Sequence, residues 1–212
     1  MEDTAGRSAP PGSLGGIVLA GGSGRRFGRP KADVVVAGRS LAARAADALA
    51  AHCDHVVVIA RPDTPLPHDL DRRVVFDRDG PRAALTAVAT GLAALDNEDV
   101  LVLGCDLIAA PAVVSALASQ PPGQAAALTD EHGVQPLCAR YPRMPALDAC
   151  ERLIAAGDLR VRQLVALLGS VLIPAIAGSL TNVNTESDAF EAARRLAGDG
   201  RAEGPAAADE RS

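Results

Sequence analysis

The chain has few aromatic residues and no long hydrophobic run. Among its 212 residues there is no tryptophan, one tyrosine and three phenylalanines, and aromatics make up 2% of the sequence. Because 48% of the residues are nevertheless hydrophobic, a substantial core must be built from small aliphatic side chains. No apolar run approaches the length that crosses a bilayer, and residues 1–14 lack the apolar segment of a signal peptide. We therefore expect a cytoplasmic protein that does not enter a membrane.

The chain also lacks the cysteine spacing of a metal site or a disulfide scaffold. Its four cysteines, Cys53, Cys105, Cys138 and Cys150, form no C-x-x-C pair and no cysteine–histidine ligand pattern. We expect them to be reduced, buried thiols, as is typical of cytoplasmic proteins.

Positive charge is scarce overall but concentrated in one place. With 21 lysines and arginines against 26 acidic residues, the net charge of −5 disfavours general binding of nucleic acid. Four of the basic residues nevertheless fall within seven positions, at Arg25, Arg26, Arg29 and Lys31. This cluster favours a small anionic ligand over DNA or RNA.

Between two tails, the sequence alternates between strand and helix patterns. Residues 1–14 and 198–212 are predicted to be disordered tails around one domain at 15–197. Short apolar runs predict strands at 15–20, 55–60, 73–76 and 99–104, and helix-forming segments predict helices at 40–51 and 82–95. Such βα units form a parallel, doubly wound sheet whose ligand crevice lies at the carboxyl ends of the strands.

The second half of the chain predicts an antiparallel addition to that sheet. Segments 125–129 and 134–141 flank a turn at 130–133 and predict a hairpin. Helices at 145–156 and 159–168 and a strand at 171–174 follow, and Thr185 and Asp188 are predicted to form the capping box of a last helix that runs to about 197. The predicted fold is α/β, a Rossmann-like, doubly wound, mostly parallel mixed sheet with helices on both faces.

The most informative stretch is the glycine-rich basic loop after the first strand. Residues 17–31 read I-V-L-A-G-G-S-G-R-R-F-G-R-P-K. Glycines allow backbone amides to approach an anion closely, so a strand that leads into this loop is a good place to hold a polyphosphate. The spacing fits neither the dinucleotide pattern G-x-G-x-x-G nor the P-loop pattern G-x-x-x-x-G-K-[ST].

This stretch resembles the signature L-A-G-G-x-[SG]-x-R-[MF]-G-x-x-K of nucleotidyltransferases related to molybdenum cofactor guanylyltransferase. The resemblance covers residues 15–196 and implies a fold like that of the nucleotide-diphospho-sugar transferases. It implies transfer of GMP from GTP to a phosphorylated acceptor, molybdopterin, with release of pyrophosphate. It also implies catalytic roles for Arg26 and Lys31, and nucleotide binding by Leu19, Ala20, Gly21, Gly22, Gly24 and Lys31.

Acidic residues follow two of the predicted strands. Asp106 comes directly after the strand at 99–104 but too early to cap a helix that begins at Pro111, so it either stabilises a turn or meets a cation. The cation is favoured, because Mg²⁺ prefers carboxylate oxygens together with substrate phosphates. The resemblance implies that Asp106 is the catalytic magnesium ligand beside the nucleotide, and that Asp77 accepts hydrogen bonds from guanine.

Two further motifs are similar to the acceptor side of the family. Gln135 and Leu137 lie in G-V-Q-P-L, and Asn182 and Asn184 lie in N-V-N-T-E-S-D. The resemblance implies that Gln135 and Leu137 line the acceptor cleft and that the two asparagines face the acceptor and the metal. Two structural explanations stay open, since asparagines at this spacing also occur in turns that only cap a helix, and Pro136 is compatible with an edge strand.

Departures from the family pattern keep other functions open. Pro30 precedes Lys31, as in cytidylyltransferase relatives, Ala60-Arg61-Pro62 replaces an asparagine often found after the second strand, and segment 80–85 loses a glycine and gains Arg82. The alternatives are a cytidylyltransferase, a sugar-phosphate nucleotidyltransferase of the same fold, and a catalytically degenerate subunit that binds nucleotide. The glycine spacing disfavours an NAD-binding domain. Nothing in the sequence identifies a protein partner.

Overall fold

The fold is built around one mixed sheet. A computed structural model of the chain describes residues 12–21, 27, 30–77, 81–109, 111–175 and 179–199. Within these residues, seven strands form one sheet in the order β10 (Val171–Pro174), β8 (Ala126–Asp130), β9 (Gly133–Pro142), β6 (Asp99–Gly104), β1 (Leu14–Leu19), β4 (His55–Ala60) and β5 (Arg73–Phe76). Neighbouring strands are parallel except where β9 pairs with β6 and β8, so the predicted hairpin and mixed sheet are confirmed.

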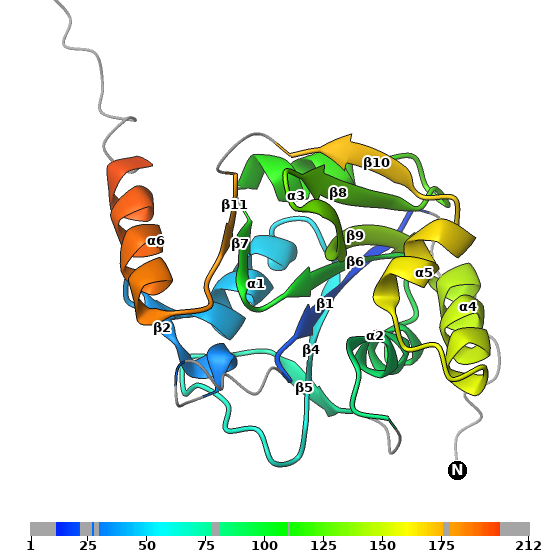
Figure 1. Ribbon diagram of the computed structural model, residues 1–212, viewed down its shortest axis with the longest axis horizontal. Helices are drawn as coiled ribbons and strands as arrows, with labels where there is room; N and C mark the ends of the chain where they lie inside the picture. The colour runs from blue at the N-terminus through cyan, green and yellow to red at the C-terminus, as the bar shows by residue number, and fades with distance from the viewer. Residues whose placement is uncertain are drawn as a thin grey trace, which may run out of the picture.

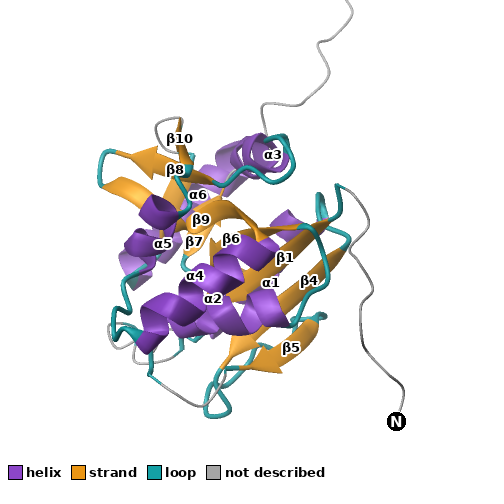
Figure 2. Ribbon diagram, turned by 90° about the vertical axis from the view of Figure 1, so that its right-hand side faces the viewer, coloured by secondary structure: helices purple, strands orange, loops and turns teal. Residues whose placement is uncertain are grey.

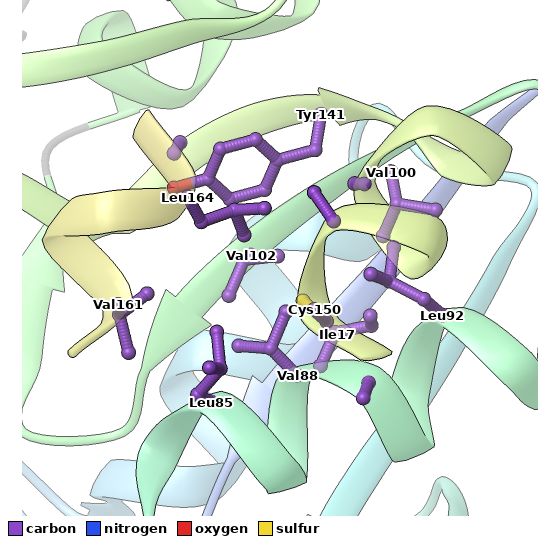
Figure 3. Close-up of a cluster of buried hydrophobic side chains, with 14 of the residues drawn as sticks. Ile17, Leu85, Val88, Leu92, Val100, Val102, Tyr141, Cys150, Val161 and Leu164 are labelled. Carbon is purple, nitrogen blue, oxygen red and sulfur yellow. The ribbon is translucent and has the colours of Figure 1, made fainter. Parts of the chain in front are cut away.

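Helices cover both faces of this sheet, as predicted (Figure 2). On one face lie α2 (Ala84–Ala93), α4 (Arg143–Ala155) and α5 (Val161–Leu167), and on the other lie α1 (Leu41–Ala50) and α3 (Pro111–Ala118). Figure 3 shows Ile17 and Val102 of the sheet facing Leu85 and Val88 of α2. Because β1 and β6 are buried along their whole length, their sequences are continuous apolar runs rather than alternating ones.

Several short elements were not predicted. The segment β7 (Leu107–Ala109) pairs antiparallel with β11 (Leu180–Asn182), and β2 (Val35–Val36) pairs with β3 (Arg39–Ser40). A single 3₁₀ turn, η1 (Lys31–Asp33), precedes them, and α6 (Glu186–Asp199) packs against β2, at the opposite end of the molecule from α4 (Figure 1). Elements of two or three residues carry no periodic pattern, so only their pairing in three dimensions reveals them.

All four cysteines are free thiols, and burial raises the pKa of Cys105, Cys138 and Cys150 to about 12. Cys53 is only partly buried. No helix in the described part of the chain is long and apolar enough to cross a membrane. The predicted tails lie almost wholly outside the described residues, so the division into tails and domain stays a prediction.

A buried ion pair ties the start of β6 to the segment after α3. Asp99 Oδ2 lies 2.6 Å from Arg140 Nη2, and the two side chains are 0% and 4% exposed. Arg140 also donates to the carbonyl oxygens of Ala118 and Gln120, and Asp99 accepts from the amide of Gly123. These contacts hold the chain between α3 and β8 against the sheet.

Asp99→Ala should destabilise the protein strongly, because it leaves the Arg140 charge buried without its partner. We expect a loss of about 3–5 kcal/mol in the free energy of unfolding, measured by urea denaturation. The control is Arg160→Ala, which breaks an Arg160–Asp158 pair of the same 2.6 Å length by removing a side chain that is 72% exposed, and which should cost little. Equal losses in the two variants would contradict the role of burial.

Candidate active site

The carboxyl ends of β1 and β6 meet where the strand order reverses. From β1 the chain moves through β4 to β5, and it then returns to place β6 on the other side of β1. Leu19 pairs with Gly104 at the ends of these strands, and the amide of Cys105 donates to the carbonyl oxygen of Leu19 at 3.1 Å. Ligands of open α/β sheets bind in the crevice at such a switch point. Gly21 and Asp106, which follow the two strands, therefore lie at the expected crevice.

The nucleotide-binding stretch predicted after β1 is described only in part. Leu19 and Ala20 are buried, and the amide of Ala20 donates to the carbonyl oxygen of Ile59 at 2.8 Å. Gly21 follows at the mouth of the crevice. The predicted residues Gly22, Gly24 and Arg26 lie outside the described residues.

Lys31 joins two predicted site residues that are far apart in the sequence. Its ammonium donates to Asp106 Oδ2 at 2.8 Å and to Asn184 Oδ1 at 2.6 Å. The Lys31 side chain is 19% exposed and the Asp106 side chain 34%, so the pair is open to a ligand but partly shielded from water. Charge-assisted hydrogen bonds of this kind are stronger than neutral ones. The structure thus brings together Lys31, Asp106 and Asn184, three residues for which the sequence analysis proposed separate roles.

The pairing of β7 with β11 brings Asn184 to Asp106 (Figure 1). Asn182 pairs with Leu107, and the amide of Val183 donates to the carbonyl oxygen of Asp106 at 2.8 Å. The side chain of Val183 is fully buried in a cluster with Val34, Val36, Leu41 and Ala192. This small core between β2, α1 and α6 therefore anchors the segment that carries Asn184.

The predicted capping box of α6 holds the backbone of Asn184. Asp188 Oδ2 accepts from the amides of Asn184 and Thr185 at 2.7 and 2.8 Å, and Thr185 Oγ1 accepts from the amide of Asp188 at 3.2 Å. These hydrogen bonds, led by the one from Asn184, lower the pKa of Asp188. The two interpretations of this motif are compatible, because the cap fixes the backbone while the Asn184 side chain reaches Lys31.

The Asp106 carboxylate has one oxygen on Lys31 and one turned toward the strand end. A Cβ placed on Gly104 would lie 2.8 Å from Asp106 Oδ1, so the glycine makes room for this carboxylate. Among the described residues, no donor to Oδ1 is present and no group of three or more histidine, cysteine or acidic side chains forms a metal cage. One carboxylate with an amide oxygen nearby fits Mg²⁺, which is commonly held by one or two carboxylates plus substrate phosphates.

Asp77 lies at the same edge of the sheet but apart from Lys31. It follows β5, its amide donates to the carbonyl oxygen of Ala60 at 2.8 Å, and its Oδ1 accepts from the hydroxyl of Thr90 at 3.0 Å. Two strands, β4 and β1, separate it from the end of β6. Asp77 thus lies at the β5 end of the crevice and Asp106 at the β6 end.

The predicted acceptor residues divide between the crevice and a neighbouring hollow. Asn182 lines a hollow of about 340 Å³ between the β8–β9 turn, β11 and α6. Gln135 does not line it directly but donates to both oxygens of Asp130, which does, at 2.9 and 3.1 Å. Leu137 lies beside the end of β6, since a Cβ on Gly104 would lie 3.8 Å from Leu137 Cβ.

The edge-strand explanation of Pro136 is wrong, because β9 lies inside the sheet. Ala127 pairs with Ala139 but the next residue, Leu128, pairs with Gln135, so residues 136–138 form a bulge opposite β8. A bulge accommodates proline because its amide is not needed in the ladder there. The bulge also places Leu137 next to Gly104.

Arg61 is a residue of this crevice that the sequence analysis noted only as a departure. It directly follows β4, and a Cβ placed on Gly21 would lie 3.7 Å from Arg61 Nε. Its position at the carboxyl end of a parallel strand is the signal that could have identified it.

A family profile described as the MobA-like NTP transferase domain matches residues 16–171. The chain belongs to this family. A probable molybdenum cofactor guanylyltransferase from Chloroflexus aggregans is 33% identical over 191 residues, covering 82% of this chain and 91% of the relative. The molybdenum cofactor guanylyltransferase of Rhodobacter capsulatus is also 33% identical over 191 residues, covering 86% of this chain and 96% of the relative.

Solved structures place the MobA-like domain in a wider fold. The 2-C-methyl-D-erythritol 4-phosphate cytidylyltransferase of Thermus thermophilus superimposes with a TM-score of 0.65 at 20% identity, covering 86% of this chain and 98% of that one. The predicted nucleotidyltransferase fold is therefore confirmed. The same fold serves proteins named for different bases, so it does not by itself select the nucleotide.

Asp188→Ala should loosen the segment that holds Asn184 and should do so in a pH-dependent way. Removing a helix cap costs about 0.5–2 kcal/mol, and we expect a loss of stability in that range at neutral pH. The folded-state pKa of Asp188 is lowered, so its stabilisation is present above the usual aspartate pKa and is lost as pH falls through the folded value.

The measurement is thermal unfolding of Asp188→Ala and wild type between about pH 7 and about pH 3. The difference in Tm should shrink toward the acid end. Glu186→Ala, in the same first turn of α6 but exposed, should show only a small difference at any pH. A difference for Asp188→Ala that grows on acidification would refute the assigned cap.

Proposed function

We propose that this MobA-like nucleotidyltransferase transfers GMP from GTP to the terminal phosphate of molybdopterin and releases pyrophosphate. The observation that carries the proposal is the contact of Lys31 with Asp106 and Asn184 at the switch point of the sheet. The names of the relatives in Chloroflexus and Rhodobacter support the choice of guanine and of the molybdenum cofactor.

Lys31 and Arg26 are proposed to neutralise charge on the α-phosphate and on the departing pyrophosphate. Lys31 is the only lysine among the 21 lysines and arginines of the chain. An ammonium acts as a mobile point charge, whereas a guanidinium grips oxygens in a fixed fork. Preorganised charge of this kind is often the largest single contribution to catalysis.

Asp106, with Asn184 beside it, would hold the Mg²⁺ ion together with the phosphates of the nucleotide. When bound, the ion supplies positive charge that offsets the negative charge of the reacting phosphates. The nucleotide is proposed to bind to the backbone of the segment after β1, at Leu19, Ala20, Gly21, Gly22 and Gly24.

The reaction needs no side-chain nucleophile and no general base. A phosphate oxygen of the acceptor attacks the α-phosphorus of GTP, a new P–O bond forms, and the bond to the β-phosphate bridging oxygen breaks as pyrophosphate leaves. The attacking phosphate is already ionised at neutral pH. Catalysis therefore rests on positioning and on charge neutralisation.

The hollow beside Asn182 is proposed to take the pterin part of the acceptor. Its lining includes four carboxylates, on Asp130, Glu131, Asp188 and Glu191, and they outnumber its cations. Carboxylates accept hydrogen bonds from the amino and ring N–H groups of a pterin but repel a phosphate. The phosphate end of the acceptor would then point back toward Lys31, past Gln135 and Leu137.

A cytidylyltransferase is the second candidate function. Pro30 before Lys31 favours it, and the fold is shared with a cytidylyltransferase of Thermus thermophilus. A sugar phosphate is then the alternative acceptor. A degenerate nucleotide-binding subunit is disfavoured, because Lys31, Asp106 and Asn184 are in contact and solvent can reach them.

The nucleotide can be identified by thermal shift with GTP, CTP, ATP, UTP and NAD, each with and without Mg²⁺. A ligand bound only by the folded state raises Tm, and a concentration a hundred times its Kd stabilises by about 2.7 kcal/mol. We expect a magnesium-dependent shift with GTP. A shift with CTP alone would reassign the protein to the second candidate, and a shift with NAD alone would reject a nucleotidyltransferase.

Lys31→Ala should lower kcat for nucleotidyl transfer about a hundredfold to a thousandfold, equivalent to about 2.7–4 kcal/mol of transition-state stabilisation. Asp106→Ala should abolish magnesium-dependent turnover. Lys31→Arg should restore little of the lost kcat, because a guanidinium donates in a fixed planar fork and an ammonium does not. Asp33→Ala, on the same short turn as Lys31, should retain full activity. Wild-type kcat in either of the first two variants would show that the site is wrongly assigned.

A further inference from the structure

Arg61 lies over the backbone that is proposed to bind the nucleotide. It is the first residue after β4, and its side chain extends toward the neighbouring strand end at Gly21. A Cβ on Gly21 would be 3.7 Å from Arg61 Nε and 3.8 Å from Arg61 Cγ, so the stem and the guanidinium both lie against this glycine. The arginine thus forms one wall of the crevice at the switch point.

The Arg61 guanidinium has no partner within the described part of the chain. It takes part in none of the ion pairs or side-chain hydrogen bonds between these residues, although it is partly buried. Asp77, at the next strand end, accepts from Thr90 rather than from Arg61. A guanidinium carries five N–H donors and no acceptor, and none of the described residues occupies these donors, so they are available to acceptor atoms of a ligand.

The order of the strands separates a phosphate end from a base end of the crevice. Along the edge formed by β6, β1, β4 and β5 come Asp106 with Lys31, then Gly21, then Arg61, and finally Asp77. The amide of Asp77 donates to the carbonyl oxygen of Ala60, which keeps the last two positions adjacent. Arg61 therefore lies on the side of Gly21 away from Lys31, beyond the place where the triphosphate is proposed to bind.

We propose that Arg61 determines the preference for guanine by donating to O6 and N7 of the base. This inference rests on the proposed function with GTP. Guanine presents two adjacent acceptors, O6 and N7, and an arginine fork matches them in a bidentate contact. Guanine also carries N–H donors on its other edge, and these donors suit a carboxylate such as Asp77. Adenine places an amino donor where guanine has O6, so it would set a donor against the donors of Arg61.

The test measures the dissociation constants of GTP, 7-deaza-GTP, ITP and CTP with wild type, Arg61→Gln and Arg61→Lys, by calorimetry with Mg²⁺ present. 7-Deaza-GTP lacks N7, and ITP lacks only the 2-amino group. Arg61→Gln should raise the dissociation constant of GTP about tenfold to a hundredfold, the range for losing a bidentate base contact, and that of ITP by the same factor. The same substitution should raise the dissociation constant of 7-deaza-GTP clearly less, because this analogue already lacks N7. Arg61→Lys should restore GTP binding only in part, because an ammonium can also donate to O6 and N7 but lacks the planar fork of a guanidinium.

The control is Arg160→Gln, which removes an exposed arginine paired only with Asp158 and should leave every dissociation constant unchanged. Equal weakening of GTP, 7-deaza-GTP and CTP by Arg61→Gln would overturn the inference, because it would indicate a contact to the phosphates. Unchanged GTP binding in Arg61→Gln would overturn it as well. Failure of the wild type to bind any triphosphate would instead refute the proposed function. Thermal unfolding of each variant distinguishes loss of contact from loss of fold.

Discussion

One ammonium group connects the parts of this protein that make up its site. Lys31 donates to an aspartate 75 residues away and to an asparagine 153 residues away. Those contacts exist only if the η1 turn, the end of β6 and the start of α6 meet at one place. A partly shielded cation needs both oxygens, since leaving it unpaired there would cost the stabilisation that water otherwise gives.

The small side chains of the core determine how closely the layers approach. Gly91 of α2 lies so near β1 that an added Cβ would be 2.6 Å from Ile17 Cδ1. Close packing of a helix on a strand holds the strand end in one position, and Gly21 continues from that strand end. The scarcity of aromatic residues noted in the sequence is therefore matched by tight contact between helix and sheet.

The single tyrosine has a specific place in this arrangement. Tyr141 is fully buried, and its hydroxyl donates to the carbonyl oxygen of Pro136 at 2.8 Å. Burial raises the pKa of Tyr141, so it remains a neutral donor. The contact supports the bulge in β9 and with it the position of Leu137 beside Gly104. A hydrogen bond inside the core thus helps to shape the acceptor side of the crevice.

The sequence alone determined the main strands and helices of the fold. Apolar runs such as 55–60 and 99–104 and the helix-forming segment 40–51 are local patterns, and local patterns decide which residues can be buried on a strand or a helix face. The glycine-rich loop indicated phosphate binding for the same reason. Roles for Lys31, Asp106 and Asn184 were also proposed, because the motifs that contain them resemble those of the family.

Only the tertiary structure decided which of these residues meet and which do not. The β7–β11 pair brings Asn184 to Lys31 and turns Asn182 toward a separate hollow, although the two asparagines are two residues apart. The bulge at Pro136 and the contact of Arg61 with Gly21 were likewise not predicted, although the position of Arg61 at a strand end could be read from the sequence. The physical reason is that short pairings and contacts between strand ends depend on segments distant in the chain, whose meeting leaves no periodic signal in either segment.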